Sequence, residues 1–216
     1  MPTRAADLAS QGLRRCRGCG EVKNIVTTER REQMQAAGLD PDRCLACEQF
    51  TAIREAHATG TVLSLDEFDD ILSLAGRIHG PALLLYARLF HVISDATITA
   101  TVGPVWQAAE YPEGPLSRAD WLDLFSVAGF TIDGKPASRP VGPTPLWRGS
   151  VPARRRRMSW TSDRAQAQRF ADGVRGRPPG KLYQTLALPE SILCINNGRE
   201  EAENVINLRG LVIQEV

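Results

Sequence analysis

Two Cys-x-x-Cys pairs near the N-terminus constrain this chain most, because they limit how the surrounding segment can fold. The pairs are separated by 24 residues and consist of Cys16 with Cys19 and Cys44 with Cys47. Both thiolates of a pair can face one ion across a tight turn, and Gly20 gives the backbone the freedom that such a turn needs. Four sulfur ligands suit tetrahedral zinc. The spacing therefore predicts a zinc site, with two disulfides or four unrelated thiols as the alternatives.

The segment around these cysteines, about residues 14–50, resembles a zinc ribbon, and we expect a module of this kind over residues 1–58. The sequence predicts a strand over residues 23–28 and a helix over residues 29–37 that ends at Gly38. So short a segment buries little apolar surface, and metal binding would supply part of its folding energy. Zinc ribbons often contact nucleic acid. Four thiolates and one zinc ion leave this segment weakly negative, however, so a purely structural role is equally open.

The composition predicts where the protein is located and shows that its charges are unevenly distributed. No apolar run reaches the roughly 18 residues that span a bilayer, and the first residues lack the apolar region of a secretory signal. We therefore expect a cytoplasmic protein with no membrane partner, in which thiols stay reduced. The net charge is only +1, yet residues 141–181 hold ten Lys or Arg and two Asp or Glu. That surplus predicts an anionic ligand or partner beside this stretch.

Helical patterns fill the middle of the chain. The capping-box sequence Ser64-Leu-Asp-Glu67 opens a first helix, and Gly80-Pro81 is expected to end it and to start a second helix that runs to about residue 94. Ser117-Arg-Ala-Asp120 opens a third helix. The proline-rich residues 131–145 have the composition of a linker. These helices predict a helical lobe over about residues 62–130.

Alternating apolar residues in the last third predict short strands. Their expected ranges are 146–149, 158–161, 182–188, 192–195, 203–207 and 211–215. Ser162 or Asp163 is expected to cap a short helix after the second strand. A β-region that follows helices gives an α+β fold. We expect a domain over residues 60–216 in which the helical lobe precedes a mainly antiparallel β-core of about residues 145–216.

Three motifs follow one another in this β-region. They are Arg148, Ser159-Trp160-Thr161 and Glu201-Ala202-Glu203, and each is weak alone. In this order they resemble the Arg-Ser-Glu class of ADP-ribosyltransferases. The resemblance covers about residues 116–216 and makes the helices from residue 64 candidates for the family's helical lobe. Further pieces agree with the family pattern: Trp147-Arg148-Gly149, Phe170-Ala171, Tyr183 and Pro189-Glu190.

The resemblance implies a mono-ADP-ribosyltransferase that moves ADP-ribose from NAD to a macromolecular acceptor and releases nicotinamide. Arg148 would bind the NAD pyrophosphate, because a planar guanidinium holds phosphate through two parallel hydrogen bonds. The backbone of Gly149 would bind the nicotinamide amide. Glu203 would stabilise the positive charge that develops on the ribose. Ser159 would hold Glu203 in place, and Thr161 would help to shape the nicotinamide pocket.

Two further residues complete the expected site. Phe170 is either a core residue or a ring that stacks on nicotinamide. Glu201 lies two residues before Glu203 on an extended segment, on the same face. It would orient or deprotonate the acceptor, and in the family a glutamate at this position accompanies transfer to arginine.

Single residues of the expected site have alternative roles, and the chain as a whole has alternative functions. Arg148 also fits a surface arginine of a strand, and the two glutamates fit a solvated acidic turn. The run Arg154 to Arg157 favours an anionic acceptor such as nucleic acid, whereas Glu201 favours a protein arginine. The chain as a whole also fits a NAD glycohydrolase that uses water as acceptor, or a non-catalytic zinc-ribbon protein that binds nucleic acid.

Overall fold

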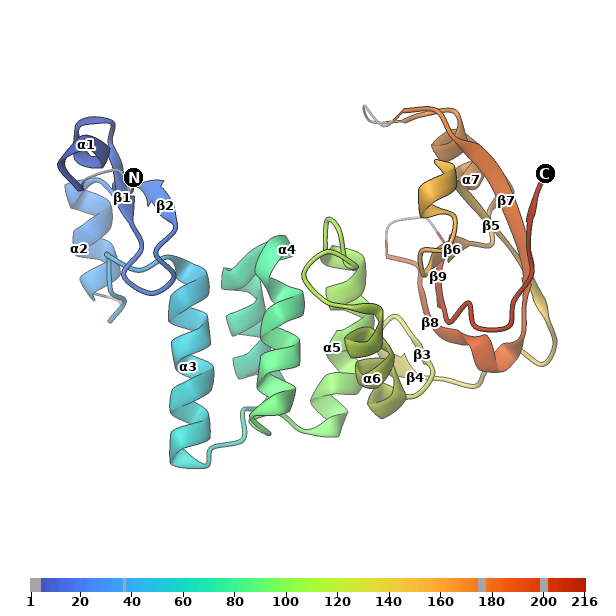
Figure 1. The fold of residues 1–216 in the computed structure, drawn as a ribbon. Helices are drawn as coiled ribbons and strands as arrows, with labels where there is room; N and C mark the ends of the chain where they lie inside the picture. Colours follow the sequence, from blue (N-terminus) through green and yellow to red (C-terminus); the bar gives the residue numbers. More distant parts are fainter. Residues whose placement is uncertain (1–4, 37, 175–177, 199–201) are drawn as a thin grey trace.

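The computed structural model describes residues 5–36, 38–174, 178–198 and 202–216. Its parts follow one another in chain order: a cysteine-containing module, a group of helices and a β-sheet (Figure 1). The fold is α+β with a mainly antiparallel sheet, as the sequence predicts. Within the described residues, no helix is both long and apolar enough to cross a bilayer.

The N-terminal module consists of two short strands between two helices. Its elements are α1 (Ala5–Ser10), β1 (Leu13–Arg15), β2 (Val22–Asn24) and α2 (Thr28–Ala36). The two strands pair antiparallel. The strand expected over residues 23–28 ends earlier, at Asn24, because Thr27 turns the chain into α2. The Thr27 hydroxyl accepts the backbone N–H of Arg30 at 3.3 Å and so caps the first turn of that helix.

Four helices build the middle of the molecule: α3 (Leu45–Thr59), α4 (Leu65–Leu89), α5 (Asp95–Ala108) and α6 (Arg118–Ala128). Both predicted capping boxes are present, at Ser64 with Glu67 and at Ser117 with Asp120. Helix α3 joins two regions, because it begins among the cysteines and its side chains Ile53 and Ala56 belong to the core of the helical lobe. The module and the lobe are therefore built around a shared helix.

The expected break at Gly80-Pro81 lies elsewhere. Helix α4 is interrupted at Gly76, which has φ 68° and ψ −173°, and it then continues past Pro81 to Leu89. A positive φ of this kind favours glycine, which explains why the kink occurs at Gly76. Proline does not end the helix because it lies near the start of the segment that follows the kink.

Helix α5 has no counterpart in the sequence prediction. Its sequence is rich in threonine and valine, which are poor helix formers. Burial outweighs this weak propensity, since one face of the helix, including Ile98, Val102 and Trp106, packs inside the protein. The Ser94 hydroxyl caps the first turn by accepting the N–H of Thr97 at 3.1 Å.

Within the described residues, the large sheet has eight strands: β3 (Thr131–Ile132), β4 (Lys135–Pro136), β5 (Thr144–Ser150), β6 (Ser159–Thr161), β7 (Lys181–Ala187), β8 (Ile192–Asn196), β9 (Glu203–Ile206) and β10 (Ile213–Glu215). Their order across the sheet is β10-β7-β5-β6-β9-β8-β3-β4. Adjacent strands are antiparallel except for β3 with β8. A short helix, α7 (Arg164–Ala171), follows β6 and is capped by Asp163.

The segment expected to be a linker begins as part of the sheet. Strands β3 and β4 form a hairpin whose turn is Asp133-Gly134, with φ values of 49° and 75°. Such Asp-Gly turns suit the right-handed twist of a hairpin. The irregular part of the segment is therefore confined to the residues between β4 and β5.

The helical lobe and the sheet share one hydrophobic core. The large buried side chains of the lobe, such as Phe68, Leu84 and Trp121, form a cluster that also contains Cys194 and Val205 from the sheet. A second cluster lies on the sheet around Leu146, Trp160, Tyr183, Ile192 and Ile206. The lobe therefore packs directly against strands β8 and β9, which sets the position of the site described next.

Candidate functional site

A cavity of about 700 Å³ lies between the helical lobe and the sheet. Its lining comes from Arg77 of α4, from α5, from the connection between α5 and α6, from strands β5, β6 and β9, from the loop between β5 and β6, and from α7. Volumes of this order suit a small-molecule ligand or cofactor. Six predicted site residues line it: Arg148, Gly149, Ser159, Thr161, Phe170 and Glu203.

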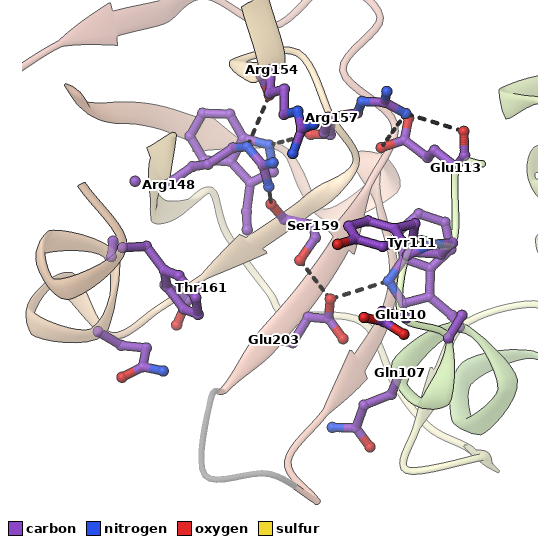
Figure 2. A pocket seen from close by; sticks show the side chains of 18 of the residues that line it. Gln107, Glu110, Tyr111, Glu113, Arg148, Arg154, Arg157, Ser159, Thr161 and Glu203 are labelled. Carbon is purple, nitrogen blue, oxygen red and sulfur yellow. Dashed lines mark hydrogen bonds and ion pairs between the residues drawn. The ribbon is translucent and has the colours of Figure 1, made fainter. Parts of the chain in front are cut away.

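Three neighbouring strands bring the separate sequence motifs together. Arg148 lies on β5, Ser159 on β6 and Glu203 on β9, and these strands are adjacent in the sheet. Thr161 fixes the register, since it pairs with Trp147 of β5 on one side and with Glu203 on the other. Residues more than 40 positions apart in the sequence therefore face one cavity (Figure 2).

The carboxylate of Glu203 is held by donors from three elements. Its Oε1 accepts the Ser159 hydroxyl at 2.5 Å and the indole Nε1–H of Trp106 at 3.1 Å. The side-chain amide of Asn196 lies 3.4 Å from Oε2. Figure 2 shows the Ser159 hydroxyl beside the carboxylate of Glu203, joined to it by a dashed line. A carboxylate with several fixed donors keeps one orientation, which suits it to stabilise a positive charge in the cavity.

The guanidinium of Arg148 ties the neighbouring backbone together. Its Nε donates to the carbonyl of Arg154 at 3.1 Å, and its Nη1 donates to the carbonyl of Ser159. These bonds fix the loop after β5 against the start of β6. Arg148 therefore positions Ser159 as well as contributing a positive charge to the cavity wall.

Gly149 allows helix α7 to approach strand β5 closely. A Cβ at this position would lie 2.0 Å from the carbonyl oxygen of Ala167 and 2.3 Å from the backbone nitrogen of Ala171. Only glycine fits there. The close approach brings Phe170 to the cavity, where it is half-buried and outside the apolar core clusters of the described residues.

Thr161 connects the strand to the same helix. It is buried, and its hydroxyl accepts the N–H of Asp163 at 3.0 Å. Asp163 in turn caps α7 by accepting the N–H of Ala165 at 2.8 Å. Thr161 thus shapes the cavity wall through the start of α7.

The arginine run divides into two parts. Arg154 and Arg157 line the cavity, whereas Arg155 and Arg156 do not. Arg154, Arg155 and Arg156 are exposed, and Arg157 is half-buried. Arg157 lies 3.7 Å from the carboxylate of Glu113. Glu113 also pairs with Arg118 of α6 at 3.3 Å and accepts the backbone N–H of Met158 at 3.2 Å. Glu113 therefore anchors one end of the basic loop to the helical lobe (Figure 2).

Glu201, the glutamate expected to face the acceptor, is among the residues that the structure does not describe.

Some cavity residues lie outside the sequence prediction. Trp106, Glu110, Tyr111 and Glu113 line the cavity from the helical lobe, and none was expected there. No motif marks them. The available signal is the Ser94 cap and the apolar run after it, which together indicate the helix that carries Trp106.

The four N-terminal cysteines form a separate cluster at the other end of the helical lobe (Figure 1). Their sulfur atoms all lie within 4.8 Å of one another, and all are free thiols. The Sγ atoms of Cys16 and Cys47 are 3.7 Å apart, close to the value of about 3.8 Å that tetrahedral bonds of 2.3 Å give. The cysteines are therefore positioned to hold a metal ion and are compatible with zinc.

Local backbone geometry prepares this cluster for a metal. Cys44 is the N-cap residue of α3, so Cys47 lies in its first turn. Gly18 packs against Cys47, since a Cβ there would lie 2.7 Å from the sulfur. Burial raises the pKa of Cys16, but backbone N–H groups of Cys19, Cys44 and Gly18 outweigh it, and the pKa falls to about 6. Burial raises the pKa of the neighbouring Cys47, so Cys16 is the thiol of this pair that ionises first. A thiolate is the form that binds metal.

Comparisons with known proteins give no information on function, so a functional proposal depends on the geometry of the site. No family model, no curated protein and no solved structure matches this chain.

Proposed function

We propose that this chain is a NAD-dependent mono-ADP-ribosyltransferase. The hydrogen bond between Ser159 and Glu203 carries the proposal, because it joins two of the three motif residues in the manner that the family resemblance implies. Arg148 on the adjacent strand supports it, as does a cavity of about 700 Å³ lined by all three residues.

The charges of the cavity wall agree with this substrate. Arg148, Arg154 and Arg157 lie toward one side and can bind the diphosphate of NAD. Glu203 then faces the nicotinamide ribose. The bond between ribose C1′ and the nicotinamide nitrogen breaks with its electron pair leaving on nicotinamide. The Glu203 carboxylate stabilises the resulting oxocarbenium-like ribose.

Transfer is completed by an acceptor nucleophile that bonds to C1′ and gives its proton to a base. In this proposal Glu201 is the acceptor-facing base. The acceptor is a protein arginine, as Glu201 favours, or a nucleic acid, as the basic loop favours. Arg155 and Arg156 are exposed outside the cavity, and we assign to them the contact with an anionic partner.

The proposal also includes a zinc ion with a structural role. Cys16, Cys19, Cys44 and Cys47 would hold it, and it would fix the start of α3. Because α3 also packs into the helical lobe, the ion would hold the N-terminal module on that lobe.

Labelled NAD tests the proposal. The protein is incubated with cell lysate and NAD labelled on the adenylate phosphate, and nicotinamide release and macromolecular label are followed together. We expect both, and digestion of the product with protease or nuclease then identifies the acceptor class. Nicotinamide release without macromolecular label would indicate a glycohydrolase. No release, with salt-sensitive binding of nucleic acid, would indicate a non-catalytic protein and overturn the proposal.

A further inference from the structure

Trp106 reaches the candidate catalytic carboxylate from the helical lobe. The residue lies on α5 and is 1% exposed, and its Nε1–H donates to Glu203 Oε1 at 3.1 Å. The Ser159 hydroxyl donates to the same oxygen at 2.5 Å. Two donors from different layers of the fold therefore converge on Oε1. Within the residues that the structure describes, Oε2 has one hydrogen-bond contact, to Asn196 at 3.4 Å, and so keeps more of its capacity to accept from a ligand.

A close approach of α5 to the sheet makes this contact possible. Gly103 lies about one turn before Trp106, and a Cβ at Gly103 would be 2.9 Å from Asn196 Oδ1 and 3.8 Å from Cys194 Sγ. Strand β8 carries both Asn196 and Cys194. The missing side chain at Gly103 thus lets α5 lie directly on β8, beside the strand that bears Glu203.

Aromatic packing fixes the direction of the indole. The ring of Trp106 contacts Trp121 edge to face, with centroids 4.9 Å apart and planes at 76°, and Phe125 lies 6.1 Å away. Both partners lie on α6. A ring enclosed on this side cannot turn its N–H away from the carboxylate without disturbing the core. The donor is therefore preorganised.

We propose that Trp106 is a positioning residue for Glu203. It holds Oε1 so that Oε2 faces the ribose at the moment when the nicotinamide bond breaks. The inference rests on the proposed function and extends it, since it makes Trp106 of α5 one of the residues that set the rate. The same hydrogen bond is not needed to bind NAD, so its loss should lower kcat and leave KM nearly unchanged.

Trp106→Phe tests the role, with Trp121→Phe as the matched control. Both substitutions remove an indole N–H from the same aromatic cluster, but the N–H of Trp121 donates to the backbone carbonyl of Pro112 at 2.8 Å. We expect Trp106→Phe to lower kcat for NAD cleavage by about 10- to 100-fold, by analogy with the loss of a residue that orients a metal ligand. KM for NAD should stay within about twofold, and Trp121→Phe should keep kcat within about threefold.

A second variant covers the case in which Trp106→Phe does not fold. Replacing Trp106 by benzothienylalanine substitutes sulfur for the N–H and keeps the ring size, and the same loss of kcat is expected. Wild-type kcat in either folded Trp106 variant would overturn the inference while leaving the proposed function intact. A loss of kcat that Trp121→Phe matches would also overturn it, since it would reflect packing alone. Absence of NAD cleavage by the wild-type protein would instead overturn the proposed function.

Discussion

The Ser159 hydroxyl donates to Glu203 Oε1 at 2.5 Å although 44 residues separate the two in the chain. The pairing of β6 with β9 produces this contact, with Ser159 opposite Val205 and Thr161 opposite Glu203. Short hydrogen bonds from a hydroxyl to a carboxylate are among the stronger ones in proteins. The sheet therefore fixes the carboxylate before any ligand binds.

Removing this hydroxyl should slow NAD cleavage. Ser159→Ala leaves Glu203 with fewer fixed donors, so we expect kcat to fall by about 10- to 100-fold with KM for NAD changed much less. Steady-state release of nicotinamide measures both constants. Ser162→Ala is the control, because Ser162 is exposed just beyond the same strand. Equal kcat values for the two variants would contradict the role given to Ser159.

The two halves of the arginine run should separate by function. Arg154 lines the cavity and its neighbour Arg155 does not. We expect Arg154→Ala to raise KM for NAD about tenfold, which corresponds to about 1.4 kcal/mol. Arg155→Ala should leave KM for NAD unchanged but weaken modification of an anionic acceptor and flatten its dependence on salt. A raised KM for NAD in Arg155→Ala, with weakened acceptor modification in Arg154→Ala, would contradict the roles given to the two arginines.

Gly149 should contribute to stability, and replacing it should lower Tm. Gly149→Ala places a Cβ 2.0 Å from the Ala167 carbonyl oxygen. Overpacking of this kind costs about 1–3 kcal/mol, and in a chain of this size each kcal/mol lowers Tm by about 2–4 °C. Gly142→Ala is the control, since nothing lies within 4 Å of its added Cβ. Thermal unfolding of the two variants checks this, and an unchanged Tm for Gly149→Ala would contradict the close approach of α7.

The cysteine cluster should hold one zinc ion per chain. Elemental analysis of the purified protein and X-ray absorption should give four sulfur ligands at about 2.3 Å. Cys44→Ser should lower the zinc content and Tm, because Cys44 begins the helix that joins the module to the lobe. Cys194→Ala should keep the zinc, since Cys194 is buried in the shared core away from the cluster. A metal-free protein with wild-type Tm would contradict a structural ion.

Local sequence signals predicted much of the fold. The capping boxes at Ser64 and Ser117, the strand ranges of the last third and the α7 cap at Asp163 are confirmed, because each depends on near neighbours in the chain. Helix α5 was missed because its β-branched residues disfavour a helix, and only burial against the lobe and sheet stabilises it. The Gly76 kink was missed because Gly80-Pro81 is the stronger local signal.

Some residues of the candidate site could be predicted from the sequence and others could not. Motif order predicted Arg148, Ser159 and Glu203, and the sheet brings them together. Trp106 could not be predicted, because its contact with Glu203 depends on the packing of a helix 97 residues away in the chain. The division of the arginine run depends on the path of a loop, which composition alone does not reveal.

The charge of Glu203 is the centre of this account, and Glu203→Gln tests it most directly. The change keeps the size of the side chain and removes the charge that faces the ribose. Loss of one preorganised electrostatic contact typically costs about 10²–10³ in rate, so nicotinamide release should collapse by that factor whether the acceptor is a macromolecule or water. Glu55→Gln, on an exposed face of α3, should keep the wild-type rate. A folded Glu203→Gln protein that cleaves NAD at nearly the wild-type rate would contradict the assignment of the catalytic carboxylate.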